Sequence, residues 1–524
     1  MTVPRYLGRT FLMIAPALVL SGCAVGPDFE RPPAPDVKTY ESTPLPAKTE
    51  SAPIRGGNAQ NFVTGNPIPT EWWTAFHSEP LNRLIALSLK HNPDLAAAEA
   101  SLREAQENTL AGYGELLPAV DAGANVQRQK ISGIAFGSNA NIPPFTVYTG
   151  TVSVSYGLDI FGGARRAIEA LSAAEDYQRY EMEAARISLA ANVVTAAVQE
   201  ASLRAQIEAT RKIIQDEKKN LDVLENQFKL GGIAKSGYLA QAANLAQAEA
   251  TLPPLEKQLA QTRHLLSVLA GQFPSDEPKG KFELASLTLP LKLPLSLPSQ
   301  LVDQRPDVRA AEATLRAASA EIGVATANML PQFTISGDIG TEIGTLASLF
   351  APGTGIWSLA AGVSQPIFHG GELLHKRRAS EAAYDEAAAI YRKTVLAAFQ
   401  DVADTLHALK SDAEALKAQA DAERAADESL QLTEQQYKDG AVPYVTLLTA
   451  EQTENQARLL LVQAEARRYT DTAALFTALG GGWWNKPMTG NEATNTEPSN
   501  DSAASTATTN INNAGEDSSA VKGD

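Results

Sequence analysis

Residues 146–163, TVYTGTVSVSYGLDIFGG, decide the fold of this 524-residue chain. Large apolar side chains, Tyr148 and the even-numbered residues from Val152 to Leu158, alternate with Thr and Ser, which is the period of a strand with one apolar face. The double glycine Gly162-Gly163 then provides a tight turn. The stretch 164–230 that follows is rich in Ala, Glu and Leu and free of Gly and Pro, which predicts one helix on the order of 100 Å long.

The same plan occurs twice in the chain. Pro93 and Pro118 are echoed by Pro306 and Pro331, both at an offset of 213 residues. The turn at Phe161-Gly162-Gly163 is echoed by Phe368-His369-Gly370-Gly371, and each echo is followed by another long helical stretch. Internal self-similarity of this kind indicates two structural repeats.

These landmarks divide the chain into five parts. The predicted parts are a signal peptide at 1–22, a lipid-anchored extended segment at 23–70, a first repeat at 71–298, a second repeat at 299–486 and a disordered tail at 487–524. Each repeat is expected to contain a first helix, a β-hairpin and a pair of long helices, and a linker ends the first repeat. The hairpins are expected at 118–161 and 331–368, and the long helices at 164–271 and 372–480.

The N-terminus has the features of an export signal. Arg5 and Arg9 precede the apolar run Phe11 to Leu20, which is too short to span a bilayer as a helix. The run ends in Leu20-Ser21-Gly22-Cys23, the box at which bacterial lipoprotein signals are cut. The cut would leave Cys23 as the new first residue, so Cys23 is expected to carry a covalent lipid such as palmitate. Cys23 is the only cysteine, which excludes an internal disulfide. By resemblance to sorted lipoproteins, Ala24 at the next position favours the outer membrane over retention at the inner one.

Composition and motifs argue against an enzyme or a nucleic-acid-binding protein. The net charge of −16 is unsuited to a phosphate backbone. The six histidines are dispersed over different predicted elements, and nucleophile-elbow, phosphate-loop and zinc-helix motifs are missing from the sequence. We therefore expect no catalytic residue, no metal and no cofactor other than the lipid.

The predicted strands raise a packing problem. Each chain supplies four strands, whereas even a small closed barrel needs about eight. An open sheet would leave unpaired edges within the bilayer, so any membrane crossing by these strands requires several copies of the chain to share one barrel. The apolar positions on the long helices likewise need neighbours on both sides.

A set of motifs gives the chain a family resemblance. They are the Cys23-Ala24-Val25-Gly26-Pro27-Asp28 start, the Asn92-Pro93-Asp94 and Arg305-Pro306-Asp307 helix starts, the two glycine turns after Phe161 and Phe368, and the Gly480-Gly481-Gly482-Trp483 end. In combination they resemble the motifs of TolC-type outer-membrane efflux proteins, and in particular those of the NodT-like lipoprotein branch. The resemblance implies an α+β membrane protein: a homotrimer whose β-barrel takes four strands from each chain and continues into a long periplasmic helical barrel. It also implies a periplasmic adaptor and an inner-membrane pump of the resistance-nodulation-division type as partners.

The resemblance also directs attention to the turns between the long helices. In the resembled family, carboxylates just after these turns form rings that narrow the entrance and attract cations. The matching positions here hold no carboxylate, so no acidic ring is carried over to this chain. The region expected to form the gate comprises Gly231, Gly232, Lys235, Tyr238, Asp439, Gly440, Thr446 and Thr449.

The function expected from the sequence is that of an outer-membrane exit duct that passively conducts small molecules or drugs to the exterior. Two alternatives remain open at this point. One is the exit duct of a type I protein-secretion system, and the other is a periplasmic coiled-coil structural or adaptor lipoprotein without a pore. Strand content separates the last from a channel, because an adaptor would lack two membrane-competent hairpins per chain.

Overall fold

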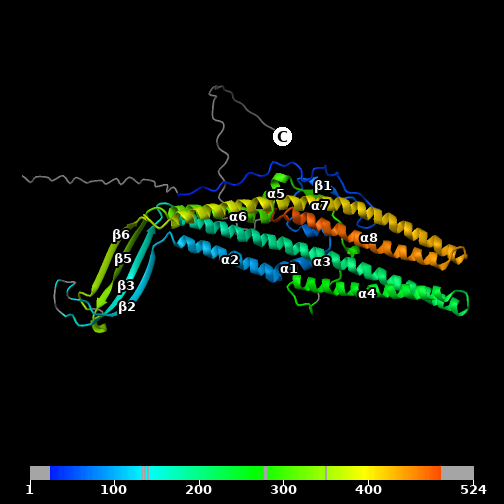
Figure 1. Ribbon diagram of the computed structural model, residues 1–524, viewed down its shortest axis with the longest axis horizontal. Helices are drawn as coiled ribbons and strands as arrows, with labels where there is room; N and C mark the ends of the chain where they lie inside the picture. Colours follow the sequence, from blue (N-terminus) through cyan, green and yellow to red (C-terminus); the bar gives the residue numbers. More distant parts are fainter. Residues whose placement is uncertain are drawn as a thin grey trace, which may run out of the picture. The chain divides into compact units, whose positions relative to one another are not determined.

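The computed structural model describes residues 24–132, 134, 137, 141–276, 280–348 and 351–485 (Figure 1). Cys23 and the expected signal peptide and C-terminal tail lie outside these residues. The major helices are α1 (Glu79–His91), α2 (Pro93–Gly114), α3 (Gly163–Lys229), α4 (Lys235–Leu269), α5 (Pro298–Gln304), α6 (Pro306–Ala327), α7 (Glu372–Lys438) and α8 (Tyr444–Ala478). The strands are β1 (Asn61–Thr64), β2 (Ala119–Gln129), β3 (Phe145–Leu158), β4 (Lys292–Leu295), β5 (Gln332–Ile343) and β6 (Gly355–Ser364). Short 3-10 turns at Trp72–Phe76, Leu284–Ser286, Leu346–Ser348 and Trp483–Asn485 complete these elements.

Corresponding helices of the two halves have equal lengths. The first helices, α2 and α6, each have 22 residues, α3 and α7 each have 67, and α4 and α8 each have 35. Both first helices begin at a proline, which suits the first turn because its missing N–H would have no partner there. At α2, the Asn92 side chain accepts hydrogen bonds from the backbone N–H groups of Asp94 and Leu95, at 2.9 and 3.2 Å.

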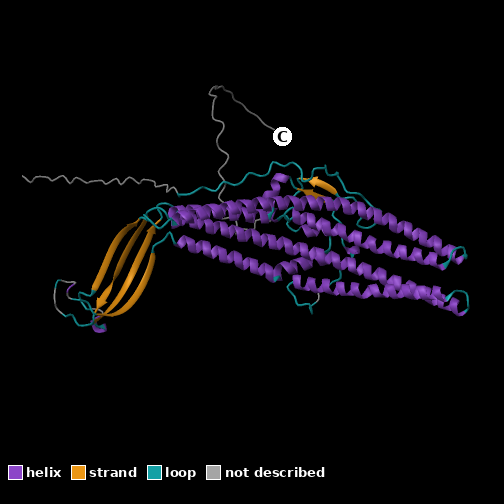
Figure 2. Cartoon of the chain, in the orientation of Figure 1, coloured by secondary structure: helices purple, strands orange, loops and turns teal. Residues whose placement is uncertain are grey.

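Four antiparallel strands form one sheet in the order β2-β3-β5-β6 (Figure 2). Alternation gives it two chemically different faces. On one face the register aligns Asp121, Ser153, Asp338 and Ser358 in a row across the strands. The other face is apolar and carries exposed large side chains: Val120, Val126, Val152, Val154, Ile335, Ile339, Trp357, Leu359 and Val363. The two outer strands, β2 and β6, each have one partner within the chain.

The long helices pack in pairs. Helix α3 lies against α4, α7 lies against α8, and α3 also contacts α8 (Figure 1). Ile207, Ile214 and Phe228 stand at multiples of seven residues along α3, and the first two are buried, as in a coiled coil. Toward the end of the helix the packing opens, and Phe228 is 36% exposed. Among the described helices, none is both long enough and apolar enough to cross a membrane.

The main hydrophobic core lies where α1, α3, α7 and α8 meet the N-terminal segment. Its largest member, Trp72, is fully buried and stacks on Phe476 of α8 with ring centroids 5.3 Å apart. Tyr469 of α8 and Phe76 pack beside them. This aromatic contact joins residues some four hundred positions apart in sequence and fixes the start of the folded body to its last helix.

The segment 24–70 is more than an extended linker. It runs along the helical body and contributes β1, which pairs in parallel with β4 from the linker between the two halves. Thr49 and Gln60 also exchange backbone and side-chain hydrogen bonds, with both N···O distances at 2.9 Å. We call residues 47–64 the strap below. The Pro- and Gly-rich composition of residues 24–70 predicts a linker, but long-range hydrogen bonds hold the strap against the body.

Candidate functional site

The turns that join the long helices have the same geometry in both halves. Gly231 follows α3 and Gly440 follows α7, with φ angles of +77° and +72°. The N–H of Gly232 donates to the carbonyl of Gln227 at 2.7 Å, and the N–H of Ala441 donates to that of Gln436 at 2.8 Å. These bonds satisfy the last carbonyl groups of each helix, and glycine tolerates the left-handed conformation they require.

Aromatic pairs tie each turn to the helix that leaves it. Phe228 stacks on Tyr238 with ring centroids 6.0 Å apart, and Tyr437 meets Tyr444 edge to face at 5.7 Å. The Tyr437 hydroxyl also donates to the Gln227 side-chain oxygen at 3.4 Å, so it links the two helical hairpins near their turns. The structure therefore brings the two regions expected to form the gate into contact through side chains.

The residues expected at the gate lie mostly on the surface of the chain. Tyr238 is half-buried, and the others are exposed: Gly231, Gly232, Lys235, Asp439, Gly440, Thr446 and Thr449. Asp439 accepts hydrogen bonds from the Gln435 side chain at 3.1 and 3.2 Å. The Thr449 hydroxyl donates to the carbonyl of Val445 at 2.9 Å, an ordinary helix contact that uses no other element.

Sequence reasoning missed a polar contact surface farther along the same hairpins. Here Asn220 of α3 donates to Glu451 of α8 at 2.7 Å, and Gln452 of α8 donates to Asn244 of α4 at 3.0 Å. Glu217 of α3 is 5% exposed and accepts a hydrogen bond from Gln241 of α4. The signal that could have revealed this surface is the placement of carboxylates and amides at positions where a coiled coil would normally carry apolar residues.

The residues that follow Cys23 are held at the junction between β3 and α3. The N–H of Val25 donates to the carbonyl of Phe161 at 2.9 Å. The buried Arg166 donates to the carbonyl of Val25 at 3.2 Å and forms an ion pair with Asp28 at 2.6 Å. Gly26 approaches Gly323 of α6 so closely that a Cβ on either residue would clash. The sequence motif after Cys23 thus has a specific structural partner at the end of the sheet.

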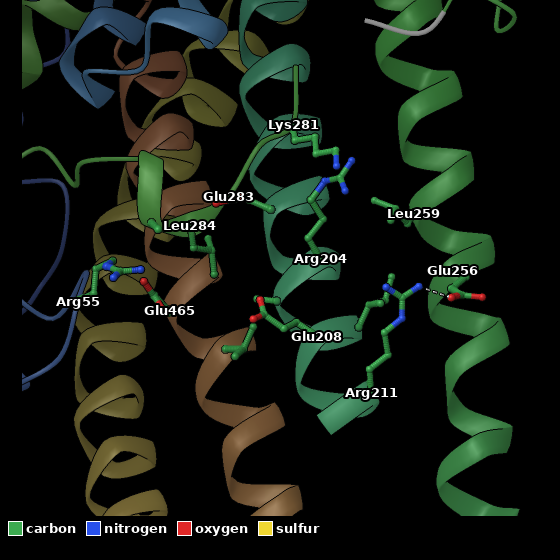
Figure 3. A pocket seen from close by; sticks show the side chains of 15 residues that line it. Arg55, Arg204, Glu208, Arg211, Glu256, Leu259, Lys281, Glu283, Leu284 and Glu465 are labelled. Carbon is green, nitrogen blue, oxygen red and sulfur yellow. Dashed lines mark hydrogen bonds and ion pairs between the residues drawn. The ribbon is translucent and has the colours of Figure 1, made fainter. Parts of the chain in front are cut away.

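A separate cavity of about 520 Å³ lies among α3, α4, α8 and the linker (Figure 3). Four cations, Arg55, Arg204, Arg211 and Lys281, line it together with four carboxylates, Glu208, Glu256, Glu283 and Glu465. Arg211 and Glu256 form an ion pair at 2.8 Å. Burial raises the pKa of Glu465 to about 7, and the nearby Arg55 opposes that shift. The lining therefore carries as many basic as acidic side chains.

Metal ligands do not gather in the described part of the chain. No group of three or more His, Cys, Asp or Glu side chains there has an arrangement that could hold a metal ion. The functional geometry is instead that of long hairpins with polar turns, joined to a sheet with one polar and one apolar face.

Known proteins share this arrangement. The sequence matches the family described as outer membrane efflux protein over residues 84–272 and 297–481. It is 30% identical to the pyoverdine export outer membrane protein OpmQ of Pseudomonas putida over 84% of this chain and 94% of OpmQ. It is 28% identical to the probable outer membrane lipoprotein SilC of Salmonella typhimurium over 90% of this chain and 98% of SilC.

A solved structure agrees with the sequence matches. The MtrE outer membrane channel of Neisseria gonorrhoeae superimposes with a TM-score of 0.74 at 27% identity, covering 88% of this chain and 99% of MtrE. The chain belongs to the outer membrane efflux protein family.

Proposed function

We propose that this protein is the exit duct of a tripartite efflux system and works as a homotrimer in the outer membrane. The four-stranded sheet is the observation that carries the proposal. Its apolar face exposes large side chains, and its outer strands β2 and β6 have free edges within the chain. Three copies that pair β6 of one chain with β2 of the next would remove those edges and close one barrel with a polar interior.

The helices continue this conduit into the periplasm. Each 67-residue helix is about 100 Å long, which exceeds what a globular domain needs. Exposed apolar residues such as Leu396 and Leu432 of α7 would then contact neighbouring chains. The hairpin turns would form the entrance, at which the gate residues named above are located.

The duct supplies no energy of its own. In the proposed assembly, a periplasmic adaptor and an inner-membrane pump of the resistance-nodulation-division type deliver small molecules or drugs to the entrance, and the duct conducts them passively. The family membership supports this division of labour, because its relatives are outer-membrane components of efflux and export systems.

Conductance is the test of this proposal. The purified full-length protein, reconstituted in a planar lipid bilayer, is expected to give discrete, stepwise pores. A matched preparation of the same detergent without protein controls for leaks. Failure to observe pores at any applied voltage or pH would contradict the proposal.

We also propose that Cys23 carries the lipid and that the barrel provides most of the membrane attachment. The hydrogen bond of Val25 to Phe161 and the ion pair of Asp28 with Arg166 support this proposal. They fix the residues after Cys23 at the junction of sheet and helices, where an acyl chain on Cys23 would lie near the membrane surface. Twelve or so embedded strands would bury far more apolar surface than the acyl chains of three copies.

A Cys23→Ser variant tests whether the lipid or the barrel contributes more to membrane attachment. Exported with a conventional signal peptide, it is expected to remain in the outer-membrane fraction, as judged by sucrose-gradient fractionation and immunoblotting. The parent protein with its own signal serves as the control. Recovery of the variant as a soluble periplasmic protein would show that the lipid, not the barrel, holds the protein in place.

A further inference from the structure

The two helical hairpins meet along a polar seam. We use this name for the contacts between the pair α3 and α4 and helix α8, formed by Glu217, Asn220, Gln241, Asn244, Tyr444, Glu451 and Gln452. Gln241 is fully buried and donates to Glu217, while its own oxygen accepts from the Tyr444 hydroxyl. This chain of hydrogen bonds connects α3 through α4 to α8. Side-chain hydrogen bonds therefore join the two hairpins along the seam.

Two carboxyl groups lie within the seam, one from each hairpin. Glu217 belongs to α3, and its side chain is almost completely buried. Glu451 belongs to α8, and one of its oxygens accepts from Asn220 at 2.7 Å. The other Glu451 oxygen is buried and accepts no hydrogen bond from the described residues. An ionised carboxylate in this setting is costly, because a buried charge needs partners to replace its hydration.

The surrounding charges increase that cost. A cavity of about 360 Å³ borders Glu217 and Glu451 and lies among α3, α7 and α8. Further carboxylates face it from all three helices: Asp216 of α3, Glu434 of α7 and Glu454 of α8. The cations that line the cavity are Lys212 and Lys219 of α3 and Arg458 of α8.

Those cations do not neutralise Glu451. Lys219 pairs with Asp216 at 3.0 Å, and Arg458 pairs with Glu454. Lys212 acts on Glu454 rather than on Glu451. Within the described residues, no cation lies at salt-bridge distance from the Glu451 carboxylate. From α4, the seam receives the uncharged Gln241 and Asn244.

We propose that Glu217 and Glu451 form a carboxyl latch that closes the seam when a proton is bound and lets the hairpins separate when both groups are ionised. Separation would let each ionised carboxylate regain water and would relieve the repulsion between them. The latch acts on the helices that surround the entrance, and it rests on the proposed function because its opening matters only if these helices enclose a conduit.

The acid–base properties of the two groups support this mechanism. Burial raises the pKa of Glu451 to about 7, and repulsion from Glu217, Glu434 and Asp216 adds to the effect. Burial also raises the pKa of Glu217, and Asp216 adds to that shift. Because both pKa values are raised in the closed state, the stabilisation of that state is complete below the ordinary pKa of glutamate, and the part that Glu451 contributes is lost as the pH rises through about 7.

Distance measurements between the hairpins can test the latch. Nitroxide labels would be placed on two exposed residues, Ser236 at the start of α4 and Ala441 in the α7–α8 turn, through Ser236→Cys and Ala441→Cys, in the full-length lipidated protein reconstituted in nanodiscs. Labelled chains would be diluted with unlabelled chains, so that double electron–electron resonance reports distances within one chain. Between pH 5.5 and pH 8, the ratio of long to short distances is expected to rise roughly tenfold.

The substitution Glu451→Gln removes the charge and keeps the oxygen that accepts from Asn220. It is expected to hold the short distance at both pH values. Glu217→Gln is expected to do the same, because either variant leaves only one of the two carboxyl groups to ionise. Glu428→Gln changes an exposed carboxyl group on α7 and serves as the matched control, which should respond to pH like the parent.

Either of two results would overturn the latch: distances in the parent that do not change with pH, or a parent-like pH response in Glu451→Gln. Conductance of the same samples separates this failure from failure of the proposed function. Pores without pH-dependent separation would reject the latch alone, whereas a sample that forms no pore would reject the conduit on which it depends.

Discussion

Replacing Arg468 with methionine is expected to release the strap from the helical body. Arg468 lies on α8 and is 1% exposed. Its guanidinium donates to the carbonyls of Gly56 and Asn58 at 3.1 and 3.2 Å, and to the side-chain oxygens of Gln60 and Thr49 at 2.8 and 3.2 Å. One side chain therefore holds four acceptors from the strap against the last helix.

The expected effect is large because methionine fills the space but donates no hydrogen bond. The carbonyls of Gly56 and Asn58 and the Gln60 side-chain oxygen would lose this donor, whereas the Thr49 hydroxyl would keep its bond from the Gln60 N–H. Each buried group left unsatisfied costs about 1–3 kcal/mol unless the strap moves into water. We expect the free energy of local opening of the strap to fall by about 3 kcal/mol, which increases hydrogen exchange at its protected amides roughly a hundredfold.

The backbone amides of Thr49 and Gln60 report this change, because both are hydrogen-bonded within the strap at 2.9 Å. Hydrogen exchange followed by mass spectrometry would measure their protection. Arg424→Met is the matched control: Arg424 is exposed and pairs with Asp421 on the same helix, so its loss should change stability by less than about 0.5 kcal/mol. Unchanged strap protection in Arg468→Met would contradict the assignment.

The second large effect is expected from Thr449→Asp. Thr449 is exposed just after the α7–α8 turn, and neutral side chains at Thr446 and Thr449 create no strong local field. In the proposed trimer, the substitution would place one new carboxylate from each chain around a narrow entrance. The ratio of cation to anion permeability is expected to rise roughly tenfold at pH 8.

The same carboxylates would repel one another, which raises their pKa and favours the neutral form. Selectivity should therefore decrease as the pH falls from 8 to 5, as measured by reversal potentials under a salt gradient. Thr449→Asn has a similar size and no charge, and it should keep the selectivity of the parent. If Thr449→Asp left selectivity unchanged from pH 5 to 8, Thr449 would not line the constriction.

Much of the local structure could be predicted from sequence periodicity. The alternating residues around Val152 and Ile335 lie in β3 and β5, and the glycine pairs at 162–163 and 370–371 stand between strand and long helix. The outer bounds of the long helices agree with expectation to within two residues, because the glycine turns beside them are strong local signals, whereas the short helices α1 and α5 were not predicted.

Contacts between residues far apart in the sequence could not be predicted from those local signals. The Pro and Gly content around the strap predicts a linker. The hydrogen bonds that hold the strap come from Arg468, more than four hundred residues away, and local composition cannot reveal them. Glu217 and Glu451 read as ordinary surface charges on helices, since their burial arises only when the two hairpins pack together. The family resemblance directed attention to the turns between the long helices as the gate region. It did not predict the polar seam farther along the same hairpins.

The central claim is that three copies of this chain enclose one conduit. An electron cryomicroscopy map of the full-length protein in lipid nanodiscs tests it most directly. We predict threefold symmetry, with β6 of each chain paired to β2 of the next and the long helices continuing the wall on one side of the bilayer. A particle in which β2 and β6 stay unpaired, or in which the strands lie outside the lipid, would contradict the account.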